Sequence, residues 1–139
     1  MKQRLKFLLF LAVALGGGCA NVELNPIPDL NRLVIGTVSF TEPATLPSDA
    51  VIVVRVLETS RKDVMSRIIG EKIIRGGGNS PIPYKVEFRA EDALVQRGMN
   101  IEARVAYDGK VQLFNGNTYA ITATDLSTPK EIVVEKISR

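Results

Sequence analysis

From Leu33 onward, apolar and polar side chains alternate in short runs, and this alternation limits the possible folds more than any other feature of the chain. A period of two is the pattern of a β-strand with one buried face. The clearest run is 82–89, which predicts one apolar face and one polar face. The predicted apolar face contains Ile82, Tyr84, Val86 and Phe88.

Related runs lie on both sides of this one, at 33–40, 51–58 and 100–107. Within them, the predicted core faces contain Val34, Val38 and Phe40, then Ile52, Val54 and Val56, then Ile101, Ala103, Val105 and Tyr107. Weaker strands are predicted at 68–75, which Gly70 interrupts, and at 131–137. A short helical turn is predicted at 91–96.

Two dipeptides predict tight turns late in the chain. Asp108-Gly109 and Asn115-Gly116 are typical of two-residue hairpins, and strands are predicted at 110–114 and 118–122. About seven to eight short strands separated by turn signals predict an all-β fold. We expect an antiparallel β-sandwich.

The first eighteen residues have the pattern of a secretory signal peptide. Lys2, Arg4 and Lys6 form a basic start, and residues 7–15 are an unbroken apolar run of nine. A membrane span needs about 20 apolar residues, so this run is too short for one. The alternative, a buried N-terminal helix, would end at the glycines of 16–18 and gives the basic start no role.

The single cysteine of the chain directly follows this segment. Gly17-Gly18-Cys19 resembles a lipobox, with Gly16 at the position where Leu is usual. This resemblance implies cleavage after Gly18 and attachment of diacylglyceryl and acyl groups to Cys19. Ala20 stands where an inner-membrane retention signal would have Asp, which favours the periplasmic face of the outer membrane. No other cofactor is expected.

The predicted organisation is therefore a signal peptide at 1–18, a lipidated cysteine and tether at 19–32, and one β-sandwich domain at 33–139. The tether contains two prolines and three asparagines and lacks apolar periodicity. Fully extended, residues 20–32 would reach at most about 45 Å.

Charge and composition exclude several classes of function. The chain has no histidine, which excludes Ser-His-Asp catalysis and His-ligated metals, and one cysteine cannot form an intramolecular disulfide. The 18 Lys and Arg residues exceed the 15 Asp and Glu residues by three, and the signal peptide contains three of the basic residues and no acidic one. The mature chain is formally neutral, which removes the composition argument for nucleic-acid binding.

Candidate catalytic motifs are weak. Glu91-Asp92 is a pair of adjacent carboxylates that suits a helix start, and the glycines at 76–78 lie between strands rather than before a helix. We therefore predict no catalytic residue, no metal site, no small-molecule substrate and no enzymatic activity.

The segments 36–40, 45–63, 68–88 and 100–121 together resemble the YscW/YbaY lipoprotein family. The matching positions are Leu46, Pro47, Ala50, Ser60, Asp63, Pro81, Pro83, Tyr84, Ala103, Gly109, Phe114 and Tyr119. The chain departs from the family at 40–43, where many relatives have basic residues after the aromatic one. The resemblance implies a periplasmic β-sandwich.

The same resemblance implies two possible functions. Some members are pilotins, which bind the C-terminal segment of a type III secretion secretin and aid its targeting to the outer membrane and its assembly there. The alternative is a general envelope lipoprotein of the YbaY type, which binds glycan or another envelope protein.

A pilotin needs an apolar surface for an amphipathic segment of its partner. The mixed strand face with Val51, Val53 and Arg55 is one candidate, and the run 68–75, with Ile69 and Ile73, is another. The alternative for each of these residues is packing within a second sheet.

Overall fold

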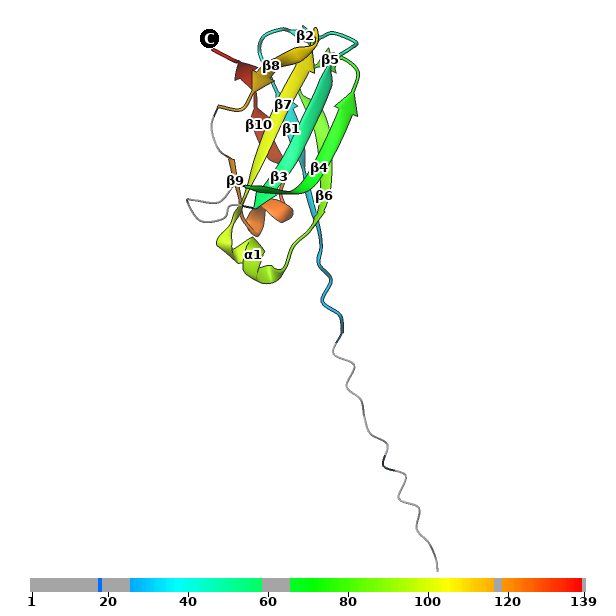
Figure 1. The fold of residues 1–139 in the computed structure, drawn as a ribbon, viewed down its shortest axis with the longest axis vertical. Coiled ribbons are helices and arrows are strands. Elements are labelled where there is room, and N and C mark those ends of the chain that lie inside the picture. The colour runs from blue at the N-terminus through cyan, green and yellow to red at the C-terminus, as the bar shows by residue number, and fades with distance from the viewer. Residues whose placement is uncertain (1–17, 19–25, 59–65, 117–118, 139) are drawn as a thin grey trace, which may run out of the picture.

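The computed structural model describes residue 18 and residues 26–58, 66–116 and 119–138 (Figure 1). The signal peptide, apart from Gly18, lies outside the described residues, and so do Cys19 and residues 59–65. The longer strands are β1 (Asn31–Ser39), β3 (Val51–Glu58), β4 (Arg67–Arg75), β6 (Ile82–Arg89), β7 (Met99–Tyr107) and β8 (Lys110–Phe114). The shorter elements are β2 (Thr45–Leu46), β5 (Gly78–Asn79), β9 (Tyr119–Ile121), β10 (Lys130–Val133), β11 (Glu135–Lys136), the helix α1 (Asp92–Arg97) and the 3-10 turn η1 (Thr124–Leu126).

The fold is mostly β. A six-stranded sheet has the order β11-β8-β7-β3-β4, with β9 also paired to β7, and a three-stranded sheet has the order β10-β1-β6. A third, small sheet pairs β2 with β5. Pairing is antiparallel except between β1 and β10, which are parallel. The expectation of antiparallel pairing is therefore correct for every described pair except that one.

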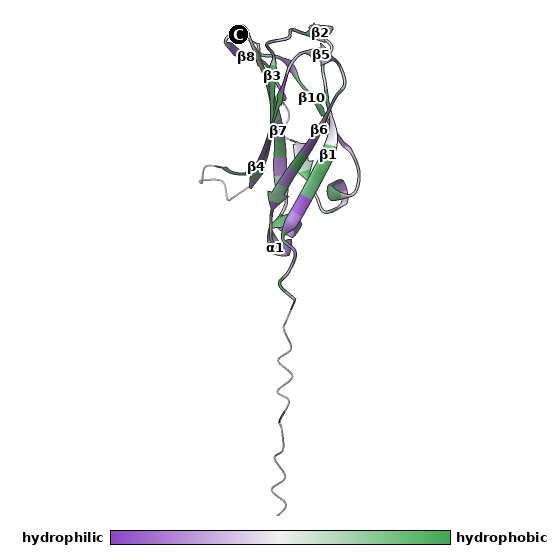
Figure 2. Ribbon diagram, turned by 90° about the vertical axis from the view of Figure 1, so that its right-hand side faces the viewer, coloured by the Kyte–Doolittle hydropathy of each residue, from purple (hydrophilic) through white to green (hydrophobic). Residues whose placement is uncertain are grey.

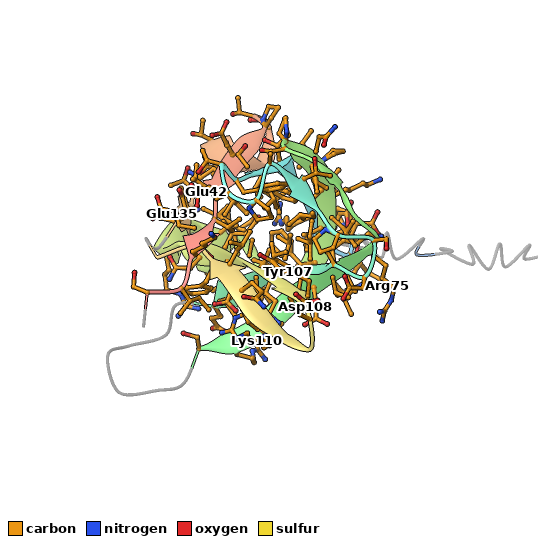
Figure 3. All side chains as sticks on the ribbon, turned by 90° about the horizontal axis from the view of Figure 1, so that it is seen from above. Glu42, Arg75, Tyr107, Asp108, Lys110 and Glu135 are labelled. Atoms are coloured by element: carbon orange, nitrogen blue, oxygen red, sulfur yellow. The ribbon has the colours of Figure 1, made fainter. Side chains whose placement is uncertain are left out.

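The two larger sheets contribute to one core. In Figure 2, β3, β4 and β7 lie to the left of β1 and β6, and Figure 3 shows side chains from the surrounding strands directed into the space between them. Alternate residues of β1, β3, β6 and β7 are buried there, as the period of two predicted. They include Val34, Val38, Ile52, Val54, Val56, Tyr84, Val86, Phe88, Ile101, Ala103 and Val105. Full burial of a Val, Ile or Phe side chain contributes about 1.5–3 kcal/mol to the free energy of folding.

The C-terminal strand joins the two sheets. β10 pairs with β1, and β11 pairs with β8 two residues later. Val134 lies between them, is buried, and donates its backbone N–H to the Ser39 carbonyl at 2.9 Å. The run predicted as one strand at 131–137 is therefore divided, because it switches from one sheet to the other.

Gly70, which interrupts the predicted strand at 68–75, marks a close approach between the sheets. A Cβ atom at this position would lie 2.7 Å from the Cβ atom of Phe88 on β6. The absence of a side chain lets β4 pass close to β6.

The turn at Asp108-Gly109 is confirmed. Both residues have positive φ, 54° and 76°, as a type I′ hairpin turn requires. The second predicted hairpin turn, at Asn115-Gly116, is wrong. β8 and β9 both pair antiparallel with the same strand, β7, so they follow one another along it instead of pairing with each other.

The side chain of Asn115 explains this interruption. It is 97% buried, since its relative exposure is 3%, and its Oδ1 accepts the backbone N–H of Ala103 at 2.8 Å. Its Nδ2 donates to the carbonyl of Ile101 at 3.4 Å. The amide therefore substitutes for backbone groups where the β7 ladder passes from β8 to β9.

Tyr84 links β6 to the parallel strand. Its hydroxyl donates to the carbonyl of Lys130 at 2.8 Å, within the space left by Gly36. Burial, together with the nearby carboxylate of Asp125, raises the pKa of this hydroxyl, so it stays protonated as a donor. Burial opposes the charge of Asp125, but hydrogen bonds from Thr122 and the charge of Lys130 lower its pKa overall.

We predict that Asn115→Ala lowers the free energy of unfolding by about 1–3 kcal/mol, because the buried N–H of Ala103 loses its acceptor. Urea denaturation of the purified protein measures this loss. Gly116→Ala is the matched control, since no heavy atom lies within 4 Å of a Cβ there. Equal stability of the two variants would contradict the role given to the amide.

We also predict that Gly36→Ala destabilises the fold by at least about 1–3 kcal/mol, the usual cost of overpacking. The new Cβ atom would lie 1.7 Å from the carbonyl oxygen of Lys130, so β1 and β10 would have to separate. Tyr84→Phe, which removes the hydrogen bond without adding an atom near β10, should lose only about 1 kcal/mol. A loss for Gly36→Ala no larger than that of Tyr84→Phe, measured by thermal unfolding, would show that the close approach is unimportant.

Candidate partner-binding surface

The face of the six-stranded sheet that points away from the core carries several apolar side chains. β3 lies between β4 and β7, and its residues Ile52, Val54 and Val56 are buried in the core. The alternate residues Val51 and Val53 therefore point outward, as do the other alternate residues of β3.

The strand register arranges this outer face in four rows, each of which crosses the strands. The first two of these rows, together with Ile137 just after β11, are called the outer patch. The first row contains Arg75, Val51, Ala106 and Val111, and the second contains Ile73, Val53, Arg104 and Phe114. The third and fourth rows contain Glu71, Arg55 and Glu102, and then Ile68, Leu57 and Asn100.

Several apolar side chains of the outer patch are well exposed. Ile73 has a relative exposure of 44%, Val111 of 40% and Ile137 of 51%. The outer face of β3 is mixed, since Val51, Val53 and Leu57 share it with Arg55. Exposed apolar patches with polar residues among them mark interaction surfaces.

The third row is charged and internally paired. Arg55 contacts Glu71 at 2.8 Å through Nε and Glu102 at 3.8 Å through its terminal nitrogen. Arg104, from the second row, contacts the same Glu102 at 3.6 Å. Such partly exposed pairs stabilise a fold by about 0–1 kcal/mol. Their effect here is to hold the two arginine side chains beside the apolar rows.

Four of the five predicted partner-binding residues share this face. Val51, Val53, Arg55 and Ile73 lie on it together, as neighbours on β3 and β4. Ile69 does not, because a β-bulge changes the register between Val56 and Leu57, and Ile69 packs against the core.

The contribution of β8 to this face was not predicted from the sequence. A second register shift lies opposite Val105 and Ala106, where Gln112 is the extra residue. It brings Val111 and Phe114 to the same face although they are three positions apart. A strict period of two assigns residues three positions apart to opposite faces. Of the residues that line this part of the surface, only Arg104 could be assigned to the outer face from the sequence, because it lies on the polar side of the run 100–107.

The edge of this sheet is protected against strand addition. Lys72 of β4 lies opposite Val54 and is therefore on the same side of the sheet as the core residues. Because β4 is an edge strand, this lysine is still exposed to solvent. A charged residue at such a position of an edge strand opposes pairing with another strand. The hollow between β4 and β6 is lined by further charges, from Glu71, Lys85 and Glu87.

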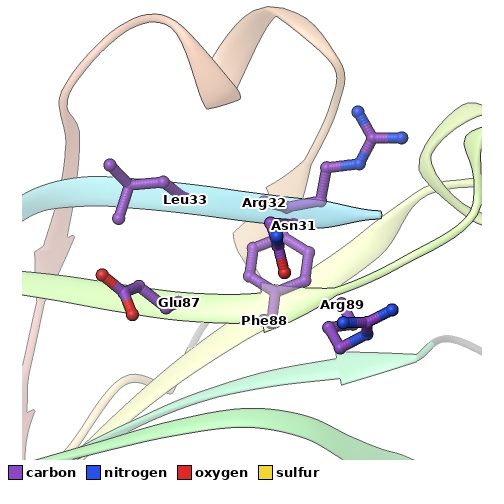
Figure 4. Close-up of a pocket in the computed structure, with 6 residues that line it drawn as sticks. All are labelled: Asn31, Arg32, Leu33, Glu87, Phe88 and Arg89. Carbon is purple, nitrogen blue, oxygen red and sulfur yellow. The ribbon is translucent and has the colours of Figure 1, made fainter. Parts of the chain in front are cut away.

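Other hollows lie at the end where the chain enters β1. Figure 4 shows one of about 400 Å³. Its lining is mixed, with Asn31, Arg32, Leu33, Glu87, Phe88 and Arg89. A neighbouring hollow near α1 is lined by Glu58, Glu91 and three arginines. Asp92, one of the adjacent carboxylates, pairs with Arg32, which gives it a structural role.

Within the described ranges, no group of three or more potential metal-ligating side chains occurs. No helix of the described part of the chain is long and apolar enough to cross a membrane.

Comparison with known proteins places the fold. An alternative pilotin from the type II secretion system of Vibrio cholerae is similar in structure, with a TM-score of 0.66 at 18% identity, over 78% of this chain and 99% of that chain. The ligand-binding region of serine-glutamate repeat protein A of Enterococcus faecium aligns over 75% of this chain and 98% of its own at 14% identity, but the TM-score of 0.31 is too low to indicate a shared fold. No curated relative matches the chain.

A family model for the type III secretion system lipoprotein chaperone YscW matches residues 30–134, a longer range than the 36–121 over which the motifs resemble this family. Proteins of this family are chaperones and not enzymes. The chain therefore belongs to the YscW family of type III secretion system lipoprotein chaperones, and its β fold is similar to that of a pilotin.

Proposed function

We propose that this protein is a pilotin, anchored by lipid at the periplasmic face of the outer membrane, which binds the C-terminal segment of a secretin and aids its targeting and assembly. The family match and the similarity of fold to a pilotin support this. The observation that carries the proposal is the outer patch, an apolar face without a covering element among the described residues. We interpret the two larger sheets as a β-sandwich that displays this face.

The position of the N-terminal segment is consistent with an anchored domain. The backbone N–H of Ala90 donates to the carbonyl of Leu30 at 3.0 Å, which fixes the start of β1 at the end that carries α1 (Figure 1). Leu30 follows Cys19 by eleven residues, which span at most about 40 Å. The α1 end would then be the end nearest the membrane, and the outer patch, on the side of the domain, stays accessible.

The proposed partner segment lies across the outer patch and does not extend the sheet at β4. Lys72 opposes strand addition at that edge. On the outer patch, a segment with an apolar side would bury Ile73, Val53 and their neighbours, at about 25 cal/mol for each Å² of apolar surface removed from water.

We predict that Cys19→Ser prevents lipid attachment and releases the domain into the periplasm, because the hydroxyl cannot replace the thiol in this modification. Metabolic labelling with a fatty acid and fractionation of the envelope measure both effects. Unchanged labelling of the serine variant would disprove the lipobox assignment.

Deletion of the gene is expected to reduce the amount of secretin multimer in the outer membrane, and complementation with Ile73→Asp should not restore it. The new carboxylate would have to lose its water under the partner segment, in place of an apolar side chain, which costs free energy. Quantitative blotting of outer-membrane fractions for the multimer is the measurement.

Ile35→Asp is the matched control for this experiment. Ile35 lies on the outer side of β1 and its exposure, 42%, is close to the 44% of Ile73. It should restore the multimer fully. If the deletion strain delivers the multimer in full amount, the pilotin proposal is wrong, and binding of the domain to glycan without any secretin would favour the envelope-lipoprotein alternative.

A further inference from the structure

One hollow within the outer patch has an almost entirely apolar lining. It measures about 260 Å³ and is lined by Arg104, Val111, Phe114 and Ile137. This is below the volume of about 300–1,000 Å³ that is typical of small-molecule sites. The hollow therefore suits one bulky side chain of a larger partner better than a separate small molecule.

The wall formed by Arg104 gives this hollow a charge. The guanidinium carbon lies 5.4 Å from the centre of the Phe114 ring, which holds the cation over the apolar floor. The side chain is 44% exposed, and its contact with Glu102, at 3.6 Å, is longer than a hydrogen bond. Glu102 also contacts Arg55, so its charge is divided between two arginines.

Arg104 can therefore accept a second carboxylate. Its guanidinium has five N–H donors in a planar arrangement that matches a carboxylate, and the long contact with Glu102 does not occupy them with a hydrogen bond. Glu135 lies opposite Phe114 on β11 and would repel an acidic group on that side. The favourable position for a carboxylate is thus between Arg104 and the first row of the outer patch.

A further cation favours an acidic partner. Arg75 ends the first row on β4 and forms no ion pair with any other described residue. Lys110 lies opposite Tyr107, on the other face of β8 from Val111, and so does not belong to the outer patch. The cations at two separate positions of the outer patch, Arg75 and Arg104, match a segment with more than one acidic side chain, which a single terminal carboxylate cannot provide.

We propose that the hollow is the anchoring point of the partner segment, where a bulky apolar side chain packs between Val111, Phe114 and Ile137 and a neighbouring Asp or Glu side chain pairs with Arg104. This rests on the proposed function, and it adds the chemistry by which the segment is recognised. The partner segment is then acidic as well as amphipathic.

The test measures binding of the full-length, detergent-solubilised lipoprotein to a synthetic peptide with the C-terminal sequence of the secretin that the same cells produce. Arg104→Gln should weaken binding about tenfold or more, the loss expected for a hydrogen-bonded ion pair. Arg104→Lys, which keeps the charge without the planar donor set, should weaken it less. Val111→Asp should also weaken binding, because it places an anion in the hollow.

Matched controls lie on the other sheet. Arg89→Gln and Ile35→Asp change exposed residues of β6 and β1 and should bind the peptide as the unchanged protein does. Added salt should weaken binding of the unchanged protein more than binding of Arg104→Gln, because one ion pair is already lost in the variant. Thermal unfolding of each variant verifies that the fold is kept.

Changes in the peptide identify the carboxylate. The acidic side chains of the peptide are replaced by amides, one at a time. At one position the replacement should weaken binding to the unchanged protein as much as Arg104→Gln does. The Arg104→Gln variant should bind that altered peptide as well as it binds the original peptide, because the ion pair is already lost. If amidation of the peptide terminus removes the dependence on Arg104 instead, the acidic side chain is the wrong group. Equal binding by the unchanged protein and Arg104→Gln would overturn this inference alone, whereas no binding by the unchanged protein would overturn the proposed function with it.

Discussion

The structure depends on β3, a strand with an apolar inner face and an outer face on which Val51, Val53 and Leu57 lie beside Arg55. Its inner residues, Ile52, Val54 and Val56, are fully buried and connect the six-stranded sheet to the core. Its outer residues cannot be buried by the same sheet, since successive side chains of a strand point to opposite faces. The stability of the domain and the exposure of the outer patch therefore follow from one run of sequence.

Much of the core was predictable because burial and strand geometry share one period. The inward residues of β1, β3, β6 and β7 follow directly from alternation, and so does the hairpin at Asp108-Gly109. The bulges at Ile69 and Gln112 were not predictable, because an extra residue changes the face without changing the composition. Asn115 was misread for a related reason: its amide replaces backbone hydrogen bonds across β7, a long-range role that a local turn signal does not reveal.

These same irregularities shape the candidate site. The bulge in β4 removes Ile69 from the outer patch, whereas the bulge in β8 adds Phe114 beside Val111. Both register shifts are set by tertiary pairing with β3 and β7. The sequence alone thus locates the strands that bear the surface, but the composition of its apolar hollow requires the register of the folded sheet.

A charged row crosses this face and limits the size of its uninterrupted apolar surface. A chaperone that waits for its partner must keep an apolar surface in water, and large uninterrupted apolar patches promote association with unrelated chains. Arg55 pairs with Glu71 at 2.8 Å and with Glu102 at 3.8 Å, and these three residues interrupt the apolar rows. Such exposed pairs add little stability, and fixed charges beside an apolar surface disfavour partners whose charges do not match. Arg104 is attached to this network only through its 3.6 Å contact with Glu102, so it can exchange Glu102 for a partner carboxylate without breaking a hydrogen bond.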